Sequence, residues 1–309
     1  LGLAAVTAVS LGAVSSGQAL DLKKGDHVIL IGNSLAERMQ HHGWLESYVQ
    51  GSMAKKEIVF RNHGFAGDKV NNRPRNQNFP SADAYLEISK ADVILAFWGY
   101  NESFDNSPDA YRADLAKWVD ETNGKKYNGK GAPRLVLLSP IAHENLGQAN
   151  LPDGSANNER LAKYTEATRQ VANEKGVEFV DLFTLSQELY EGSEKPLTIN
   201  GIHLTSEGNQ LLAQGIYKNL FGKAPKVGKR KLGRIQNAVL NKNWHWYNRY
   251  RATDGNDVWG GRSGLAFVNK QTFFFVVDDV FILIVMLSGI GDLFLIEGFC
   301  GYLMMSVDR

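Results

Sequence analysis

Short apolar runs alternate with longer amphipathic stretches from residue 20 to about residue 221. Runs of this length predict buried strands, and the stretches between them predict helices that bury one face. Strands that are apolar almost throughout and are separated by helices are typical of a parallel sheet covered on both sides. The pattern therefore predicts an α/β fold, a three-layer α/β/α sandwich with about five parallel strands. The expected strands are residues 27–31, 57–60, 91–98, 134–138 and 177–182, and the expected helices are residues 34–50, 109–122, 157–174 and 205–220.

The first 19 residues have a different character. They contain no charged residue, carry an apolar run and end with the small residues Gly17 and Ala19, as a signal-peptidase site does. We interpret residues 1–19 as a signal peptide without its charged lead, which predicts a secreted or periplasmic protein. A buried helix is the alternative interpretation. The run is too short and too rich in Ala, Gly and Ser to be a membrane span.

The pattern changes again after residue 221, the expected end of the main domain that begins at residue 20. Residues 222–234 hold six basic residues with Pro and Gly, which predicts an exposed basic linker. Residues 235–272 are rich in Trp, Tyr and Arg and are expected to form an aromatic extension that packs on the domain or faces sugars. Residues 273–309 are a hydrophobic tail, interpreted as a frameshifted or truncated end or as a membrane-associated segment. Its longest uncharged run has 12 residues, so no stable membrane span is expected.

Composition narrows the function classes. The 309 residues, 43% hydrophobic and 22% charged, are typical of a globular protein with at least one full core. The 34 Lys and Arg residues nearly balance the 33 Asp and Glu residues, so no nucleic-acid partner is expected. The single cysteine, Cys300, excludes an intramolecular disulfide and a metal site built from cysteines. None of these features indicates an oligomeric state.

Four polar motifs follow predicted strands, at the edge of the sheet where ligands of open α/β sheets bind. Ser34 stands after the first strand, Gly67 in the loop after the second, Asn101 after the third, and His203 directly before the last helix. Each has an ordinary structural interpretation when taken alone: a helix N-cap, a turn glycine, an Asx turn and a structural histidine. Only the combination of the four motifs indicates a catalytic site.

In chain order the motifs read GNS, NHGFAG, GYNE and NGIH. They resemble the four blocks of the SGNH hydrolases, the GDSL-type esterases and acylhydrolases: Gly-Asp-Ser, Asn-x-Gly-x-x-Gly, Gly-x-Asn-Asp and Asp-x-x-His. Four ordered motifs at independently predicted strand ends are much more specific than one motif. The resemblance spans residues 26–221, and the aromatic extension looks like the segment that trails such domains in secreted bacterial proteins. It implies a flavodoxin-like sandwich and a hydrolase that needs no cofactor and no metal.

The resemblance also implies roles for individual residues. Ser34 would be the nucleophile and His203 its general base. The N–H groups of Ser34 and Gly67, with the side-chain amide of Asn101, would form the oxyanion hole. A serine hydroxyl needs a base to take its proton, and each fixed oxyanion donor contributes about 3 kcal/mol to catalysis. The expected reaction is cleavage of a carboxylic ester through an acyl-enzyme, with a short-acyl ester of a carbohydrate or another small ester as substrate.

Three positions depart from the family pattern. Asn33 and Glu102 replace aspartates that take no part in the bond-making steps. Asn200 replaces the triad aspartate, and an amide cannot offset the charge of an imidazolium as a carboxylate does. Two hypotheses follow. Either a Ser-His dyad works with help from an amide or a backbone carbonyl, or the chain is a weakened or inactive SGNH-fold domain that binds carbohydrate or serves as a scaffold.

Two further features lie near the predicted strand ends. His143 follows the fourth strand and is interpreted either as a substrate contact or as a solvated loop histidine. Residues 69–80 form a polar loop that carries Arg73 and Arg75. We interpret it as a rim for an acidic or sulfated sugar or, more simply, as a solvated loop.

Overall fold

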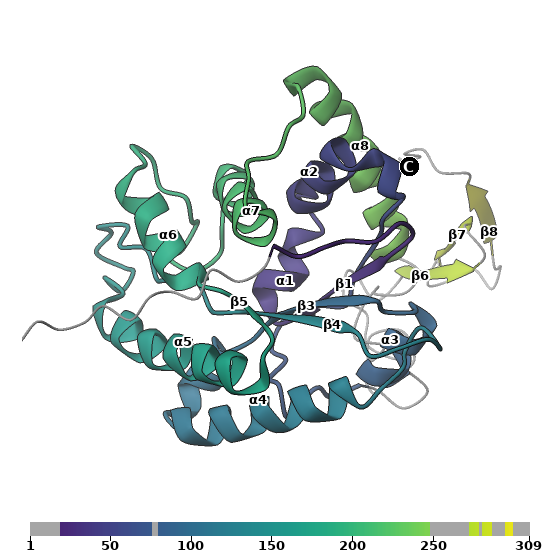
Figure 1. Cartoon of the computed structure of the whole chain (residues 1–309). Coiled ribbons are helices and arrows are strands. Elements are labelled where there is room, and N and C mark those ends of the chain that lie inside the picture. The colour runs from purple at the N-terminus through teal and green to yellow at the C-terminus, as the bar shows by residue number, and fades with distance from the viewer. Residues whose placement is uncertain (1–18, 76–79, 248–271, 278–279, 286–293, 299–309) are drawn as a thin grey trace, which may run out of the picture.

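The computed structural model describes residues 19–75, 80–247, 272–277, 280–285 and 294–298 (Figure 1). Its main sheet is parallel throughout, and its strands follow the order β2-β1-β3-β4-β5, which is the order found in flavodoxin. The prediction of an α/β sandwich with five parallel strands is confirmed. The strands are β1 (His27–Gly32), β2 (Val59–Asn62), β3 (Val93–Phe97), β4 (Arg134–Leu138) and β5 (Glu178–Val180).

Helices cover both faces of this sheet. In Figure 1, α4 and α5 lie on one side, and α1, α2 and α7 lie on the other. Side chains of a strand alternate between the faces, so Val28 and Leu30 of β1 enter one core while Ile29 and Ile31 enter the other. The helices are α1 (Ser34–Met39), α2 (Trp44–Ser52), α3 (Ala82–Ile88), α4 (Pro108–Asn123), α5 (Ser155–Lys175), α6 (Leu182–Glu191), α7 (Ser206–Phe221) and α8 (Lys229–Trp246), with 3₁₀ turns η1 (Ala54–Lys56) and η2 (Glu102–Asp105).

The single helix predicted for residues 34–50 is wrong, because the structure divides it into α1 and α2. Gln40 ends α1, and Gly43 precedes α2 in a left-handed conformation with φ of +64°. A Cβ atom on Gly43 would lie 2.8 Å from the side chain of Val239 in α8. The break therefore needs glycine for its backbone angle and gives α8 room to approach.

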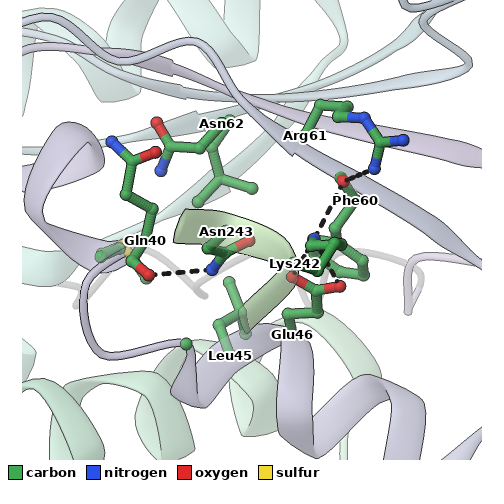
Figure 2. Close-up of a pocket in the computed structure, with 11 residues that line it drawn as sticks. Gln40, Leu45, Glu46, Phe60, Arg61, Asn62, Lys242 and Asn243 are labelled. Carbon is green, nitrogen blue, oxygen red and sulfur yellow. Dashed lines mark hydrogen bonds and ion pairs between the residues drawn. The ribbon is translucent and has the colours of Figure 1, made fainter. Parts of the chain in front are cut away.

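Helix α8 begins inside the segment predicted to be a basic linker. Residues 222–228 are not helical, but Lys229 starts the helix, so the linker is shorter than expected. Lys242 of α8 donates to both carboxylate oxygens of Glu46 at 2.8 and 2.6 Å and to the carbonyl of Phe60 at 3.2 Å. Figure 2 shows this ion pair, together with the Asn243 amide donating to the carbonyl of Gln40 at 2.9 Å.

These contacts surround a small pocket between α2, β2 and α8, and none of the predicted catalytic or oxyanion residues lines it. The indole N–H of Trp246 donates to the carbonyl of Asn62 at 2.8 Å, at the end of β2. Helix α8 is thus packed on the strand that leads into the loop containing Gly67.

Three further strands occur in the C-terminal tail: β6 (Thr272–Val277), β7 (Val280–Val285) and β8 (Phe294–Gly298), paired antiparallel in that order. The apolar pattern of this tail predicted no such sheet. Most of the predicted signal peptide, residues 1–18, and residues 248–271 of the aromatic extension lie outside the described residues. Within the described ranges, no helix combines the length and apolar character needed to cross a membrane.

Candidate active site

Ser34 is the first residue of α1, but it does not cap that helix. The N-cap is Asn33, whose side-chain oxygen accepts the backbone N–H of Leu35 at 3.3 Å. The hydroxyl of Ser34 forms no hydrogen bond within the part of the chain that the structure describes. Because Asn33 supplies the cap, the Ser34 hydroxyl is available to face a ligand.

Ser34 and His203 line the same cleft, which opens to solvent at the carboxyl ends of β1 and β3. Among the described residues, no direct hydrogen bond joins the Ser34 hydroxyl to the His203 ring. Nucleophile–base contacts are often long in a free enzyme and shorten when substrate binds. The other lining residues are Asn33, Leu35, Phe97, Trp98, Tyr100, Ser139, Pro140, Ile141 and Ile202.

The ring of His203 is oriented by Asn200. The side-chain oxygen of Asn200 lies 3.1 Å from His203 Nδ1 and accepts the backbone N–H of His203 at 3.0 Å. Because this atom accepts a backbone N–H, it is the oxygen of the amide and carries no hydrogen of its own. The hydrogen in its bond to the ring is therefore on Nδ1. The neutral ring then carries a lone pair on Nε2, which is the form a general base requires.

The surroundings of His203 favour that neutral form. Burial lowers the pKa of His203 below its usual 6.5, the Arg38 cation lowers it further, and Glu37 acts in the opposite direction. Arg38 and Glu37 both belong to α1, the helix that begins at Ser34. A lowered pKa leaves the imidazole unprotonated and able to accept a proton at neutral pH.

Gly67 and Asn101 lie beside each other near this cleft, although neither is among the residues that line it. The side-chain amide of Asn101 donates to the carbonyl of Asp68 at 2.9 Å, next to Gly67. Gly67 is exposed with φ of +87°, and its N–H has no hydrogen-bond partner in the described ranges. The structure therefore brings together the second and third predicted oxyanion donors, beside Tyr100 of the cleft.

Glu102 fixes the distance between the loops that carry Gly67 and Asn101. Its carboxylate is buried and accepts the N–H groups of Val70 at 2.8 Å and Gly99 at 2.9 Å. Burial raises the pKa of Glu102, and these backbone donors oppose the rise. No catalytic role was predicted for Glu102, but its carboxylate braces the two loops against each other.

A buried ion pair supports the Gly67 loop from the other side. Arg75 donates to both carboxylate oxygens of Asp68, at 3.0 and 2.8 Å, and its guanidinium lies 3.6 Å from the ring centre of Phe65. The side chains of Arg75 and Asp68 are only 7% and 3% exposed. Arg75 is thus neither a solvated residue nor a free cation on a substrate rim, because Asp68 holds it.

Glu144 holds the loop that carries His203. Its carboxylate accepts the N–H groups of Leu197 and Thr198 at 2.9 and 2.7 Å and the Thr198 hydroxyl at 2.6 Å. Its own N–H donates to the carbonyl of Gly201 at 2.8 Å. Sequence reasoning missed Glu144. The sequence did contain a clue, because Glu144 follows the apolar strand at residues 134–138 and is adjacent to His143.

His143 packs beneath the same loop and is only 7% exposed. A Cβ atom on Gly201 would lie 2.2 Å from His143 Nε2, and the Asn157 amide lies 3.1 Å from Nδ1. Burial lowers the pKa of His143. The interpretation as a solvated histidine is therefore wrong, and His143 is not among the cleft-lining residues. Within the described ranges, no group of three or more His, Cys, Asp or Glu side chains could hold a metal ion.

Comparison with known proteins identifies the family of the chain. Residues 30–211 match the model of the GDSL-like lipase/acylhydrolase family. The GDSL esterase/lipase CPRD49 of Arabidopsis thaliana is 25% identical over 204 residues, which cover 62% of this chain and 77% of that protein.

Among solved structures, Axe2, an acetylxylan esterase from Geobacillus stearothermophilus, is similar with a TM-score of 0.51 and 18% identity, over 68% of this chain and 100% of that chain. Variants of Axe2 in which a serine, an aspartate or a histidine is replaced by alanine are described as catalytic mutants. At this identity the likeness establishes the fold.

Proposed function

Since the chain belongs to the GDSL-like lipase/acylhydrolase family and is an esterase or acylhydrolase, we propose that it removes short acyl groups, acetyl foremost, from carbohydrate or other small esters. The observation that carries this proposal is that Ser34 and His203 line one cleft, with Asn200 holding the ring of His203. The acetylxylan esterase named among the similar structures supports the choice of a short acyl group on a sugar.

In the proposed reaction, the hydroxyl oxygen of Ser34 attacks the ester carbonyl while Nε2 of His203 takes its proton. The carbonyl oxygen becomes an oxyanion, for which the N–H groups of Ser34 and Gly67 and the amide of Asn101 are the donors. The tetrahedral intermediate collapses, and the alcohol leaves with the proton from His203. Water then attacks the acyl-enzyme with His203 again as base, which releases the carboxylic acid and restores Ser34.

Asn200 makes this a dyad rather than a triad. Its side-chain oxygen fixes the tautomer and the orientation of His203 but supplies no negative charge to stabilise the imidazolium. The proposal therefore includes a lower turnover than a carboxylate at this position would give.

We also propose that the protein is exported to the periplasm or the outside of the cell. The support is the uncharged apolar start of the chain with small residues at its end. A carbohydrate ester substrate is consistent with that location.

The experiment is hydrolysis of p-nitrophenyl acetate by the full chain. Ser34→Ala and His203→Ala should each lower turnover at least about 10³-fold, because nucleophile and base act as a unit. Ser155→Ala is a matched control, since Ser155 also opens a helix, and His41→Ala is a histidine control in the turn that follows α1. Equal rates in the parent, Ser34→Ala and His203→Ala would contradict the catalytic assignment.

Labelling with a fluorophosphonate separates the enzyme from an inactive carbohydrate-binding domain. Modification of the parent but not of Ser34→Ala supports an activated nucleophile. Failure to label the parent, while an active serine esterase in the same tube is labelled, would favour the inactive domain.

A further inference from the structure

An exposed aromatic side chain lies next to the catalytic cleft. Phe104, in η2, is 62% exposed, although burial is the usual state of a phenylalanine. Its ring centre is 5.6 Å from that of Tyr100, and the two rings meet edge to face at 74°. Tyr100 lines the cleft that contains Ser34 and His203. The surface of Phe104 is therefore continuous with the catalytic cleft through one ring contact.

Arg160 of α5 adds a cation to this surface. Its guanidinium lies 5.0 Å from the ring centre of Phe104. It is oriented by two hydrogen bonds, from Nη2 to the Asn157 side chain at 2.5 Å and from Nε to the Ser103 hydroxyl at 3.5 Å. In the described ranges, Arg160 has no carboxylate partner, and its Nη1 makes no hydrogen bond. These N–H groups remain available to a ligand. We call Tyr100, Phe104 and Arg160 the aromatic platform.

The aromatic platform stands on a fixed base. Ser103, the neighbour of Phe104, is fully buried, and its hydroxyl donates to the carbonyl of Tyr100 at 2.7 Å. Glu102 precedes it and is tied to the N–H groups of Val70 and Gly99. The exposed ring therefore projects from a well-anchored turn, so a ligand that stacks on it meets a surface that is already in place.

The chemistry of the aromatic platform favours a sugar ring. A pyranose has an apolar C–H face that can cover an aromatic ring, and hydroxyl groups around its edge that accept hydrogen bonds from a guanidinium. A long acyl chain would need an enclosed apolar channel, whereas this ring is open to solvent. A polyanion would need several cations, whereas the platform carries one.

We propose that the aromatic platform is a subsite for the pyranose ring of a sugar ester, placed to hold the alcohol part while the acyl group enters the cleft at Ser34. This inference rests on the proposed esterase function and names its substrate class. Phe104 stacks on the ring, Tyr100 connects the subsite to the cleft, and Arg160 donates to the sugar hydroxyls.

The test compares two esters of the same acyl group. A methyl pyranoside with a single acetyl group carries the sugar ring and its free hydroxyls, and ethyl acetate has an alcohol too small to reach the platform. The readout is the ratio of kcat/KM for the pyranoside to kcat/KM for ethyl acetate. Phe104→Ala should lower this ratio about tenfold, mainly through KM, because the variant loses the ring on which the sugar stacks; tenfold corresponds to about 1.4 kcal/mol.

Two further variants make the result specific. Phe104→Trp keeps an aromatic face and should retain the ratio of the parent within about twofold. Ile88→Ala is the matched control, because Ile88 is 60% exposed on α3 and does not line the cleft. An equal ratio in Phe104→Ala, Ile88→Ala and the parent would overturn the proposal. So would a loss on 2-naphthyl acetate without a loss on the pyranoside, which would indicate a subsite for aromatic alcohols.

A binding measurement separates the failure of this inference from the failure of the esterase function. Calorimetry on Ser34→Ala and on Ser34→Ala/Phe104→Ala should show about tenfold weaker pyranoside binding in the double variant. If the parent cleaves neither ester but this difference remains, the sugar subsite stands and the esterase function fails. If both esters are cleaved but the two variants bind equally, the esterase stands and the subsite is wrong.

Discussion

Two loop clusters flank the proposed catalytic cleft, and they use their buried carboxylates in the same way but differ at the side chain proposed to react. On the nucleophile side, Glu102 accepts two backbone N–H groups and so joins the loops of Gly67 and Asn101. On the base side, Glu144 accepts the N–H groups of Leu197 and Thr198 and a hydroxyl. The ring of His203, however, contacts an amide, that of Asn200.

The comparison separates two contributions to the site: the position of the loops and the charge next to the His203 ring. Both clusters hold their backbone with carboxylates that are less than 10% exposed, so the geometry of each loop is well supported. The base side gives His203 the correct tautomer without negative charge to stabilise its protonated form. In the proposed mechanism, Ser34 and His203 share one cleft, and their transition state is less stabilised than in a triad with aspartate.

The largest effect should come from removing either carboxylate brace. Glu144→Ala leaves two N–H groups and one hydroxyl without their acceptor, and Glu102→Ala leaves two N–H groups. At about 1–3 kcal/mol for each orphaned donor, we expect the free energy of unfolding to fall by roughly 3–5 kcal/mol for Glu144→Ala and somewhat less for Glu102→Ala. Urea denaturation measures both.

Glu159→Ala is the control for these variants, because Glu159 is exposed on α5. A loss below about 1 kcal/mol for Glu144→Ala would show that the base-side loop does not depend on its carboxylate. The two clusters would then differ in what holds their loops as well as in the charge beside the reacting side chain.

The next effect concerns the charge that the base side lacks. Asn200→Asp keeps the length of the side chain and adds a carboxylate beside Nδ1 of His203, so turnover should rise about tenfold or more. In a serine protease triad the reverse change lowers turnover by about 10⁴. Asn200→Ala removes the acceptor from Nδ1 and should lower turnover. Initial rates with p-nitrophenyl acetate at saturating substrate provide the measurement.

Asn237→Asp adds the same charge at an exposed position of α8 and should leave turnover unchanged. If Asn200→Asp turned over more slowly than the parent, the amide would contribute something that a carboxylate cannot. The contrast between position and charge would then be wrong.

The sequence predicted the fold and the order of the site because both depend on short-range patterns. Runs such as residues 91–98 are apolar since their strands are buried on both faces, and a buried parallel strand leaves that mark in any sequence. Three of the motifs directly follow these strands, and the fourth directly precedes the last helix, so these positions indicated that Ser34 and His203 share one cleft.

The features that were missed depend on contacts between distant segments. The break at Gly43 follows from the approach of α8 about 200 residues later, which no local periodicity records. Helix α6 was missed because its ten residues follow β5 after a single residue, Asp181, which caps it. Arg75 looked like a solvated loop residue, because only the fold shows that Asp68 holds it in a buried pair. Polar residues used as internal braces look like surface residues in a sequence.

The smallest effect tests how the two sides of the cleft are coupled. The proposed mechanism requires neutral His203, and the pKa of His203 lies below 6.5 because burial and then Arg38 lower it, while Glu37 opposes them. The kcat/KM of the parent should therefore be lost only as pH falls through that lowered pKa. Arg38→Met removes a lowering cause and should move the acid limb to higher pH, whereas Glu37→Gln should move it lower. Added salt should reduce both shifts, since it screens partly exposed charges.

Shifts in opposite directions would show that α1, which begins at the nucleophile, also sets the proton affinity of the base. Lys117→Met on α4 is the control for a change of net charge, because Lys117 is an exposed cation outside the cleft. Shifts in the same direction for Arg38→Met and Glu37→Gln, or none in either, would contradict the coupling. Opposite shifts would mean that Arg38 and Glu37 of α1 set the pKa of His203, which the uncharged side chain of Asn200 does not do. The two clusters would then act as one site.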